Sequence, residues 1–325
     1  MKQGRLQVGK RAGKTAGSTA RNVATARAAA GGMLWISPWL AGLLLLFVIP
    51  AGYALWFSLC DYSLLSRPVY VGLENYRELL GDERVWRSGI NSAVYAVASV
   101  IGATGLSLAI AVLLDMGLKG SGVVRAIVFA PTLVPVVSAC VVWGWLFNQQ
   151  FGLINTVIRL VTGMSPLEGP DWIGSARLAM PSLIVMSLWT IGSSLMIASA
   201  ALRDVPRSLY EAASIDGMGA LRRLWHVTIP MISPALLFNA LMSVVWSLQV
   251  FAQPQIMTKG GPGDSTITYS MSVYAAGFVY GRMGYACALA WVQALVIFAV
   301  AGLSLIHISE PTRLRRISYA VFCLK

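Results

Sequence analysis

Six long apolar segments, none of which contains a charged side chain, constrain the fold of this 325-residue chain more than any other feature. A helix needs about 20 apolar residues to cross the roughly 30 Å hydrocarbon core of a bilayer, and each segment is long enough. Because backbone polar groups in lipid must bond to one another, such segments cross as helices. We therefore predict an all-α integral membrane protein with six transmembrane helices. The predicted spans are 33–59, 89–114, 126–148, 178–202, 231–256 and 285–308.

The composition supports a membrane class and argues against a nucleic-acid partner. Charged residues make up only 12% of the chain, against roughly a quarter in a soluble domain. The net charge of +12 is unevenly placed, because seven basic residues and no acidic ones precede the first span, in residues 1–32. The positive-inside rule then predicts that this arm, which we expect to be disordered, lies in the cytoplasm. Alternation of the spans puts 60–88, 149–177 and 257–284 outside, with 115–125 and 203–230 in the cytoplasm.

The cytoplasmic segment 203–230 is a polar island between two apolar segments. We predict two short helices in it. Asp204 is expected to cap the first helix, with Pro206 in its first turn, where a missing N–H costs little. Asp216-Gly217 is expected to end that helix, since glycine tolerates the left-handed conformation that follows a helix. The second helix is expected to run from about Ala220 until Pro230 interrupts it.

A spaced motif lies within this island. It reads Glu-Ala-Ala, three residues, Gly, nine residues, then an aliphatic residue, one residue, an aliphatic residue and Pro, at Glu211, Ala212, Ala213, Gly217, Val227, Ile229 and Pro230. This pattern resembles the cytoplasmic signature loop of bacterial ABC-importer permeases of the carbohydrate, maltose-type family. The resemblance implies that the loop docks into a cleft of a separate ATPase. The implied ATPase-coupling residues are Glu211, Ala212, Ala213, Asp216, Gly217, Ile229 and Pro230.

Two motifs in the predicted outer loops extend the resemblance to about residues 33–302. One is the stretch 71–76, and the other is Gly260-Gly261-Pro262 followed by Ser265-Thr266. The resemblance implies a six-transmembrane-helix ABC importer permease with a cytoplasmic coupling-helix loop, in the bacterial cytoplasmic (inner) membrane. It implies four kinds of partner: a second homologous permease, a dimer of cytoplasmic ATP-binding subunits, an extracytoplasmic solute-binding protein and the lipid bilayer. ATP and Mg would be bound by the ATPase, so we expect no cofactor in this chain.

The same sequence bears on the competing functions. Ion-coupled secondary transporters usually keep charged relays inside their spans, and none is present here, although this class stays an alternative. A membrane enzyme is disfavoured because the chain has neither HExxH nor GxSxG, so we name no catalytic residue. Four cysteines without a CxxC pattern and two histidines give no metal site.

Uncharged polar side chains on the fifth predicted span form a candidate solute pathway. They follow nearly one helical stripe, and a tryptophan on the fourth span joins them; the residues are Asn239, Ser243, Trp246, Gln249, Gln253 and Trp189. Amides and hydroxyls both donate and accept hydrogen bonds without charge, which suits a sugar or related polyol. The alternative for each residue is a structural role, in which its side chain forms a hydrogen bond between neighbouring helices. A glycerol-phosphate-type or polyamine solute also stays open.

The last 23 residues look foreign to the rest of the chain. From Leu303 the sequence closely resembles a translated sequencing-library adapter, whereas the alternative is a natural basic cytoplasmic tail. We therefore predict three parts: a basic arm (1–32), a permease domain (33–302) that contains the coupling loop (203–230), and an adapter-derived tail (303–325).

Overall fold

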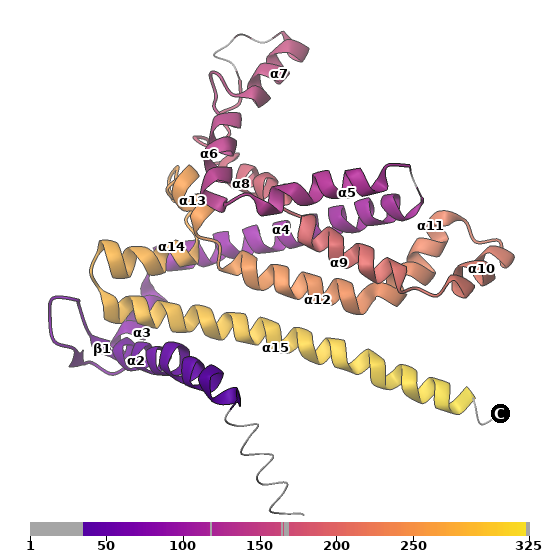
Figure 1. The fold of residues 1–325 in the computed structure, drawn as a ribbon. Coiled ribbons are helices and arrows are strands. Elements are labelled where there is room, and N and C mark those ends of the chain that lie inside the picture. The colour runs from indigo at the N-terminus through magenta and orange to yellow at the C-terminus, as the bar shows by residue number, and fades with distance from the viewer. Residues whose placement is uncertain (1–34, 118, 164, 166–168, 323–325) are drawn as a thin grey trace, which may run out of the picture. The chain divides into compact units, whose positions relative to one another are not determined.

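The computed structural model describes residues 35–117, 119–163, 165 and 169–322, and these are mainly helical (Figure 1). The chain divides into two compact units, Met1–Phe57 and Ser58–Lys325. In the first unit, a helix that begins at Trp35 contains a π-helical stretch, η1 (Leu44–Val48), and continues as α2 (Ile49–Ser58). Its length and hydropathy satisfy the requirements for a membrane span, which agrees with the predicted span 33–59.

The second unit opens with a small hairpin and a short helix before its first long helix. Strands β1 (Cys60–Asp61) and β2 (Val69–Tyr70) pair antiparallel. Helix α3 (Glu74–Gly81) follows, and the Asn75 amide donates to the Ser58 and Cys60 carbonyls at 2.9 Å each. Asn75 belongs to the 71–76 motif, so in this chain the motif fastens α3 to the hairpin. Helix α4 (Glu83–Asp115) is capped by the Asp82 side chain and contains the predicted span 89–114.

The third predicted span, 126–148, is not one straight helix. Helix α5 (Ser121–Phe129) continues into the 3-10 turn η2 (Ala130–Leu133), and α6 (Val136–Leu146) then leaves at an angle of 104°. Pro135 explains this break: a proline lacks the N–H that a continuing helix needs, and it forces the preceding residue into an extended conformation. Val134 is indeed extended, with ψ of 126°.

The fourth predicted span is also bent, by 48°, between α8 (Ala179–Leu188) and α9 (Gly192–Arg203). Gly192 lies at this bend against α5, where an added Cβ would come within 2.7 Å of the Phe129 Cα. In the described part of the chain, four helices are long and apolar enough to cross a membrane, or up to six if each bent pair counts as one span.

The remaining elements complete the second unit in chain order. They are α7 (Leu153–Thr162), α10 (Arg207–Ile215), α11 (Ala220–Arg223), η3 (Leu224–Thr228), α12 (Ile229–Leu248), α13 (Ala252–Met257), α14 (Tyr269–Tyr274), η4 (Ala275–Val279) and α15 (Met283–Phe322). Helix α15 runs without a break past Gly302, the last residue before the predicted foreign tail. The origin of that tail stays a prediction.

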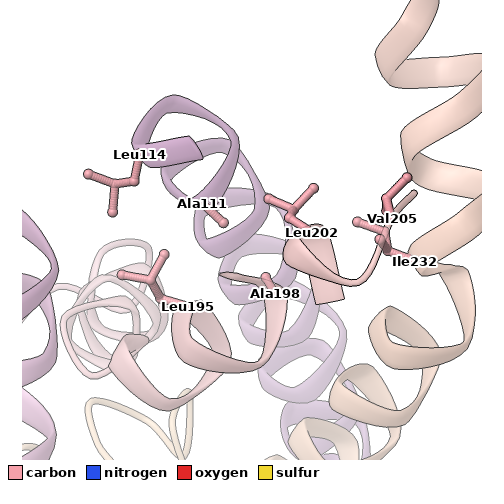
Figure 2. Close-up of a cluster of buried hydrophobic side chains, with 7 residues drawn as sticks. All are labelled: Ala111, Leu114, Leu195, Ala198, Leu202, Val205 and Ile232. Carbon is pink, nitrogen blue, oxygen red and sulfur yellow. The ribbon is translucent and has the colours of Figure 1, made fainter. Parts of the chain in front are cut away.

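Two apolar clusters mark the two ends of the packed helices. The first joins α4, α9 and α12 (Figure 2) and consists of Ala111, Leu114, Leu195, Ala198, Leu202, Val205 and Ile232. The second joins α3, the start of α4, η4 and the start of α15, and consists of Leu79, Val85, Ala276, Tyr285, Ala286 and Leu289. Since α4 contributes to both clusters and spans about 50 Å at 1.5 Å per residue, the clusters lie at opposite ends of the unit.

Candidate functional site

The predicted first helix of the coupling loop is α10, but it starts differently from the prediction. Pro206 occupies the N-cap position just before Arg207, and no side chain caps the helix. Asp204 instead ends α9 as its C-cap. The prediction of Asp204 as the N-cap was therefore wrong. Burial of Val205 in the cluster of Figure 2 explains the difference, because it fixes the turn between α9 and α10 so that the N-cap lies two residues later than predicted.

The end of α10 confirms the predicted break at Asp216-Gly217. Asp216 is the C-cap, and Gly217 has a φ of +71°, a left-handed conformation that favours glycine. The Met218 N–H donates to the Ala213 carbonyl and the Gly217 N–H to the Ser214 carbonyl. This pair of bonds is a Schellman motif, which satisfies carbonyls that a helix end otherwise leaves free. The chain therefore reverses at a defined point after α10.

The Glu-Ala-Ala motif divides between a surface and a buried position. Glu211, Ala212, Asp216 and Gly217 are exposed, whereas the Ala213 side chain is only 3% exposed within this chain. Ala213 therefore packs inside this chain, and the coupling role implied for it stays a prediction.

Hydroxyl groups tie α10 to the base of α12. The Tyr210 hydroxyl lies 3.1 Å from the Thr228 hydroxyl, and Thr228 is buried in η3. Arg223 donates to the Ser214 hydroxyl, which itself donates to the Tyr210 carbonyl at 2.8 Å. The Tyr210 ring also packs against the apolar cluster of Figure 2. Our sequence reasoning missed both Tyr210 and Thr228, because nothing in the spacing shows that two hydroxyls 18 residues apart will meet.

The second helix of the loop does not end at Pro230, contrary to the prediction. Helix α11 continues through the π-helical turn η3 directly into α12, with Pro230 in the first turn of α12. A π turn shifts the hydrogen-bond register by one residue, and such turns accommodate a local disturbance inside a continuous helix. Ile229 and Pro230 are half-buried at the start of α12, whereas the other motif residues except Ala213 are exposed or partly exposed.

Two shallow hollows flank the turn at Gly217. One, of about 420 Å³, is lined by Arg207, Tyr210, Glu211, Ser214 and Ile215. The other, of about 570 Å³, is lined by Gly219, Ala220, Leu221, Arg222, Trp225 and His226. Large apolar side chains stand exposed in both, and exposed apolar groups rimmed by polar ones are typical of interaction sites.

The predicted solute-pathway residues do not form one helical stripe. Helix α12 ends at Leu248, so that Gln249 is its C-cap and Gln253 lies in the separate helix α13. Only Asn239, Ser243 and Trp246 share α12. The sequence pattern suggested a longer helix because no proline or glycine marks the interruption at 249–251.

The predicted pathway residues also differ in burial and in the contacts that they make. Asn239 is buried, and its Nδ2 has no hydrogen-bond partner among the described residues, whereas Ser243 donates to the Asn239 carbonyl. Trp246 is 75% exposed. Trp189 ends α8 and packs edge-on against Trp143, with ring centroids 6.0 Å apart. The structure therefore brings together a part of the predicted set on α12 and places Trp189 in an aromatic pair.

Gln293 is a polar residue near this region that our sequence reasoning missed. Its amide, on α15, donates to the Leu248 carbonyl at the end of α12 and to the Ser270 hydroxyl on α14. Together with Gln249 it lines a hollow of about 380 Å³. Its position inside a predicted apolar span could have drawn attention to it, because a polar side chain in a span is costly unless it is hydrogen-bonded or takes part in the function.

The end of the unit opposite the coupling loop is fastened by charged groups. Arg84 pairs with Asp264 at 3.2 Å and donates to the Tyr280 hydroxyl. The Asn91 amide donates to the Asp264 and Ile267 carbonyls, so that α4 holds the loop that carries the Gly260-Gly261-Pro262 motif.

A second ion pair joins α3 to the start of α15. Arg282 donates to both carboxylate oxygens of Glu78 at 2.6 and 2.5 Å. These hydrogen bonds, more than any other cause, lower the pKa of Glu78. Among the described residues, no group of three or more His, Cys, Asp or Glu side chains could hold a metal ion.

Comparison with known proteins gives a family and several relatives. The model of the family "Binding-protein-dependent transport system inner membrane component" matches residues 87–313. The trehalose/maltose transport system permease protein MalF of Thermococcus litoralis is 32% identical, over 76% of this chain and 83% of that protein. The sn-glycerol-3-phosphate transport system permease protein UgpA of Yersinia enterocolitica is 33% identical, over 75% of this chain and 82% of that protein.

The fold has also been seen before. A bacterial alginate ABC transporter, solved in complex with an alginate pentasaccharide-bound periplasmic protein, contains a chain that superimposes with a TM-score of 0.73. The match covers 86% of this chain and 93% of that chain, at 18% sequence identity. The chain therefore shares its fold with a chain of this transporter.

Proposed function

This chain belongs to the family of binding-protein-dependent transport system inner membrane components, and we propose that it is the permease subunit that passes a sugar or related polyol. The predicted importer permease and its non-enzymatic role are confirmed by the family. The solute class is our proposal. It is supported by relatives described as permeases for trehalose/maltose and sulfoquinovosyl glycerol, the latter 30% identical over 83% of this chain.

The single observation that carries the proposed coupling to a separate ATPase is the geometry of α10. Its exposed side presents Glu211, Ala212 and the Gly217 turn, while Tyr210 and Ala213 hold it to the bundle. A rigidly mounted helix with small side chains on its outer face lets a partner approach closely. We infer that the partner is a cytoplasmic ATP-binding subunit, present as a dimer, which binds ATP and Mg.

The same proposal sets the topology and the remaining partners. If α10 faces the cytoplasm, the basic arm at 1–32 is cytoplasmic and the loop at 258–268 is extracytoplasmic. A solute-binding protein would then deliver its ligand at the end held by Arg84, Asp264 and Asn91. A second, homologous permease would complete the membrane part.

The uncharged α12 favours a neutral solute within the family. Asn239 and Ser243 offer an amide and a hydroxyl, and Trp246 offers a broad exposed ring. None of these side chains neutralises a phosphate. A glycerol-phosphate-type solute is the second candidate, favoured by the likeness to the sn-glycerol-3-phosphate permease. An ion-coupled mechanism has no support from the family.

The test is solute-stimulated ATP hydrolysis in proteoliposomes. The chain is reconstituted with the ATPase, second permease and binding protein encoded beside its gene, and neutral oligosaccharides are compared with glycerol 3-phosphate. We expect a neutral sugar to stimulate hydrolysis and to accumulate inside. Stimulation by glycerol 3-phosphate alone would overturn the solute class, and uptake driven by an ion gradient without ATP would overturn the importer mechanism.

A further inference from the structure

Helix α7 (Leu153–Thr162), between α6 and α8, is not used by the transport site described above. It stands at the end of the arm formed by α6 and α7, to the side of the helices α4, α9 and α12 (Figure 1). Its ten residues extend about 15 Å, half the thickness of the hydrocarbon core, so α7 cannot cross a membrane. The apolar side chains of α7 must therefore have a role other than crossing the bilayer.

One face of α7 is apolar and uncovered. Leu153, Val157, Leu160 and Val161 follow the i, i+4, i+7, i+8 spacing that places side chains on one side of a helix. Leu160 and Val161 are each 81% exposed, and the other two are about half exposed. Phe151, just before the helix, is exposed as well. The stripe is therefore continuous along the helix.

The polar side chains of α7 are all turned to its own chain. Asn155 is fully buried, donates to the Gln149 and Pro170 carbonyls, and accepts from the Trp172 indole at 2.8 Å. The Arg159 guanidinium donates to the Gln149 carbonyl through one terminal nitrogen, while its buried Nε has no hydrogen-bond partner among the described residues. The two threonines, although exposed, donate their hydroxyls back to helix carbonyls, Thr156 to Gly152 and Thr162 to Ile158.

This bonding pattern distinguishes among possible partners. A protein interface usually has a polar rim that bonds to the other side, whereas the exposed polar side chains of α7 are only the hydroxyls of Thr156 and Thr162, whose hydrogens are already donated within the helix. Hydrocarbon requires the opposite, namely that every polar group be satisfied internally. The only charged residue of α7 is Arg159, and it is already hydrogen-bonded to the Gln149 carbonyl. The helix therefore offers no other charge that would attract a soluble partner. The adjoining α6 exposes Val137 and Val141 and thus extends the apolar surface from a chain that spans the bilayer.

We propose that α7 is an interfacial anchor that lies in one leaflet of the bilayer, with Leu153, Val157, Leu160 and Val161 among the acyl chains. Amphipathic helices bind the boundary between headgroups and acyl chains through such an apolar face. With α10 in the cytoplasm, the occupied leaflet is the outer one. The anchor fixes the arm between α6 and α8, and this inference is independent of the solute proposed above.

The experiment uses two spin labels on opposite faces of α7. Leu160→Cys and Thr162→Cys are made in the full chain, with its four native cysteines replaced by alanine, and reconstituted in phosphatidylcholine–phosphatidylglycerol vesicles. At 100° per residue the two positions point about 160° apart, so that Thr162→Cys is the matched control. Power saturation measures the accessibility of each label to oxygen, which concentrates in lipid, and to a water-soluble nickel chelate. Val157→Cys provides a second position on the apolar face.

We expect the labels at 160 and 157 to be several-fold more accessible to oxygen than to the nickel chelate, and the label at 162 to show the reverse preference. Equal access of nickel chelate to 160 and 162 would overturn the proposal, because the apolar face would then lie in water. Low access of both reagents to 160 in the assembled transporter would overturn it as well, because the face would then be covered by a second permease.

Discussion

The end of the second unit that carries α10 and α11 is held by apolar side chains and hydroxyl groups, whereas the opposite end adds ion pairs and amides to its own apolar cluster. At the first end, Val205 and Tyr210 pack into the cluster of Figure 2, and Tyr210 meets Thr228. At the other end, Arg84 and Arg282 pair with carboxylates that are themselves about 40% exposed.

The difference follows from what each end must do under the proposed function. Apolar packing holds α10 in one position, so that a movement of the ATPase docked on its exposed face is transmitted to α12. Exposed ion pairs are weak and sensitive to salt, so the opposite end can rearrange when a binding protein docks. The comparison implies that disrupting the apolar packing at the coupling end costs more stability than removing an exposed ion pair at the outer end, and four predictions test or sharpen it.

The largest expected effect is that of Ala213→Glu. A carboxylate at this buried position has no partner, and we expect a loss of about 4 kcal/mol or more in the stability of the loop. The measurement is limited proteolysis and thermal unfolding of the full chain in detergent. Ala212→Glu is the matched control, because the neighbouring alanine is exposed.

For Ala212→Glu we expect wild-type stability together with loss of binding to the partner ATPase. Equal destabilisation by the two substitutions would mean that both alanines pack inside the chain. Normal solute-stimulated hydrolysis with Ala212→Glu would contradict the proposed docking surface.

The second prediction tests the amide hydrogen bonds that hold the loop at the outer end. Asn91→Leu removes the two hydrogen bonds that its amide donates to the Asp264 and Ile267 carbonyls. The Asp264 carbonyl keeps the bond from the Ile267 N–H at 3.4 Å, so the expected cost of about 1 to 3 kcal/mol arises mainly at the Ile267 carbonyl. The expected result is a lower unfolding temperature and faster proteolysis within 258–268, with unchanged proteolysis of the loop at 203–230. Protection of 258–268 equal to that of the wild type would show that the loop is held by other contacts.

The third prediction concerns the link between α10 and α12. Tyr210→Phe keeps the ring in the apolar cluster but removes the hydroxyl that meets Thr228, a change of about 1 kcal/mol. We expect the ATPase to bind normally while the solute transported per ATP hydrolysed falls several-fold. Thr228→Val should lower the coupling as much as Tyr210→Phe does, whereas Thr228→Ser, which keeps the hydroxyl, should couple like the wild type. The double variant Tyr210→Phe/Thr228→Val should be no worse than either single variant. Additive losses would show that the two hydroxyls act separately.

The smallest effect is expected for Glu78→Gln. The pair with Arg282 is about half exposed, so its net contribution is below about 1 kcal/mol. Since Arg282 lowers the pKa of Glu78 in the folded state, the contribution is present above the ordinary carboxyl pKa of about 4 and is lost as the pH falls through the lowered value. Unfolding temperatures of the wild type and the variant should therefore differ slightly at pH 7 and converge once the pH falls below the lowered pKa of Glu78. A difference that persists at low pH would assign the effect to packing.

Much of this molecule followed from the order of its residues. Long uncharged apolar segments must become helices in lipid, which is why the spans on α4 and α15 lie close to where they were predicted. The break after α10 was equally local, because Gly217 can adopt a left-handed conformation without steric cost. The spacing of Glu211, Ala212 and Gly217 by itself indicated the family to which the chain belongs.

The tertiary structure decided what depends on residues distant in the sequence. Whether Ala212 or Ala213 faces outward is set by which side of α10 packs against the bundle, and the two alanines are identical in sequence terms. The meeting of Tyr210 with Thr228, and of Gln293 with the end of α12, depends on how helices pack across a distance that no local pattern encodes. Pro230 gives the physical reason most clearly: local rules predict a helix end there, whereas a π turn and the packing of α12 keep the helix intact.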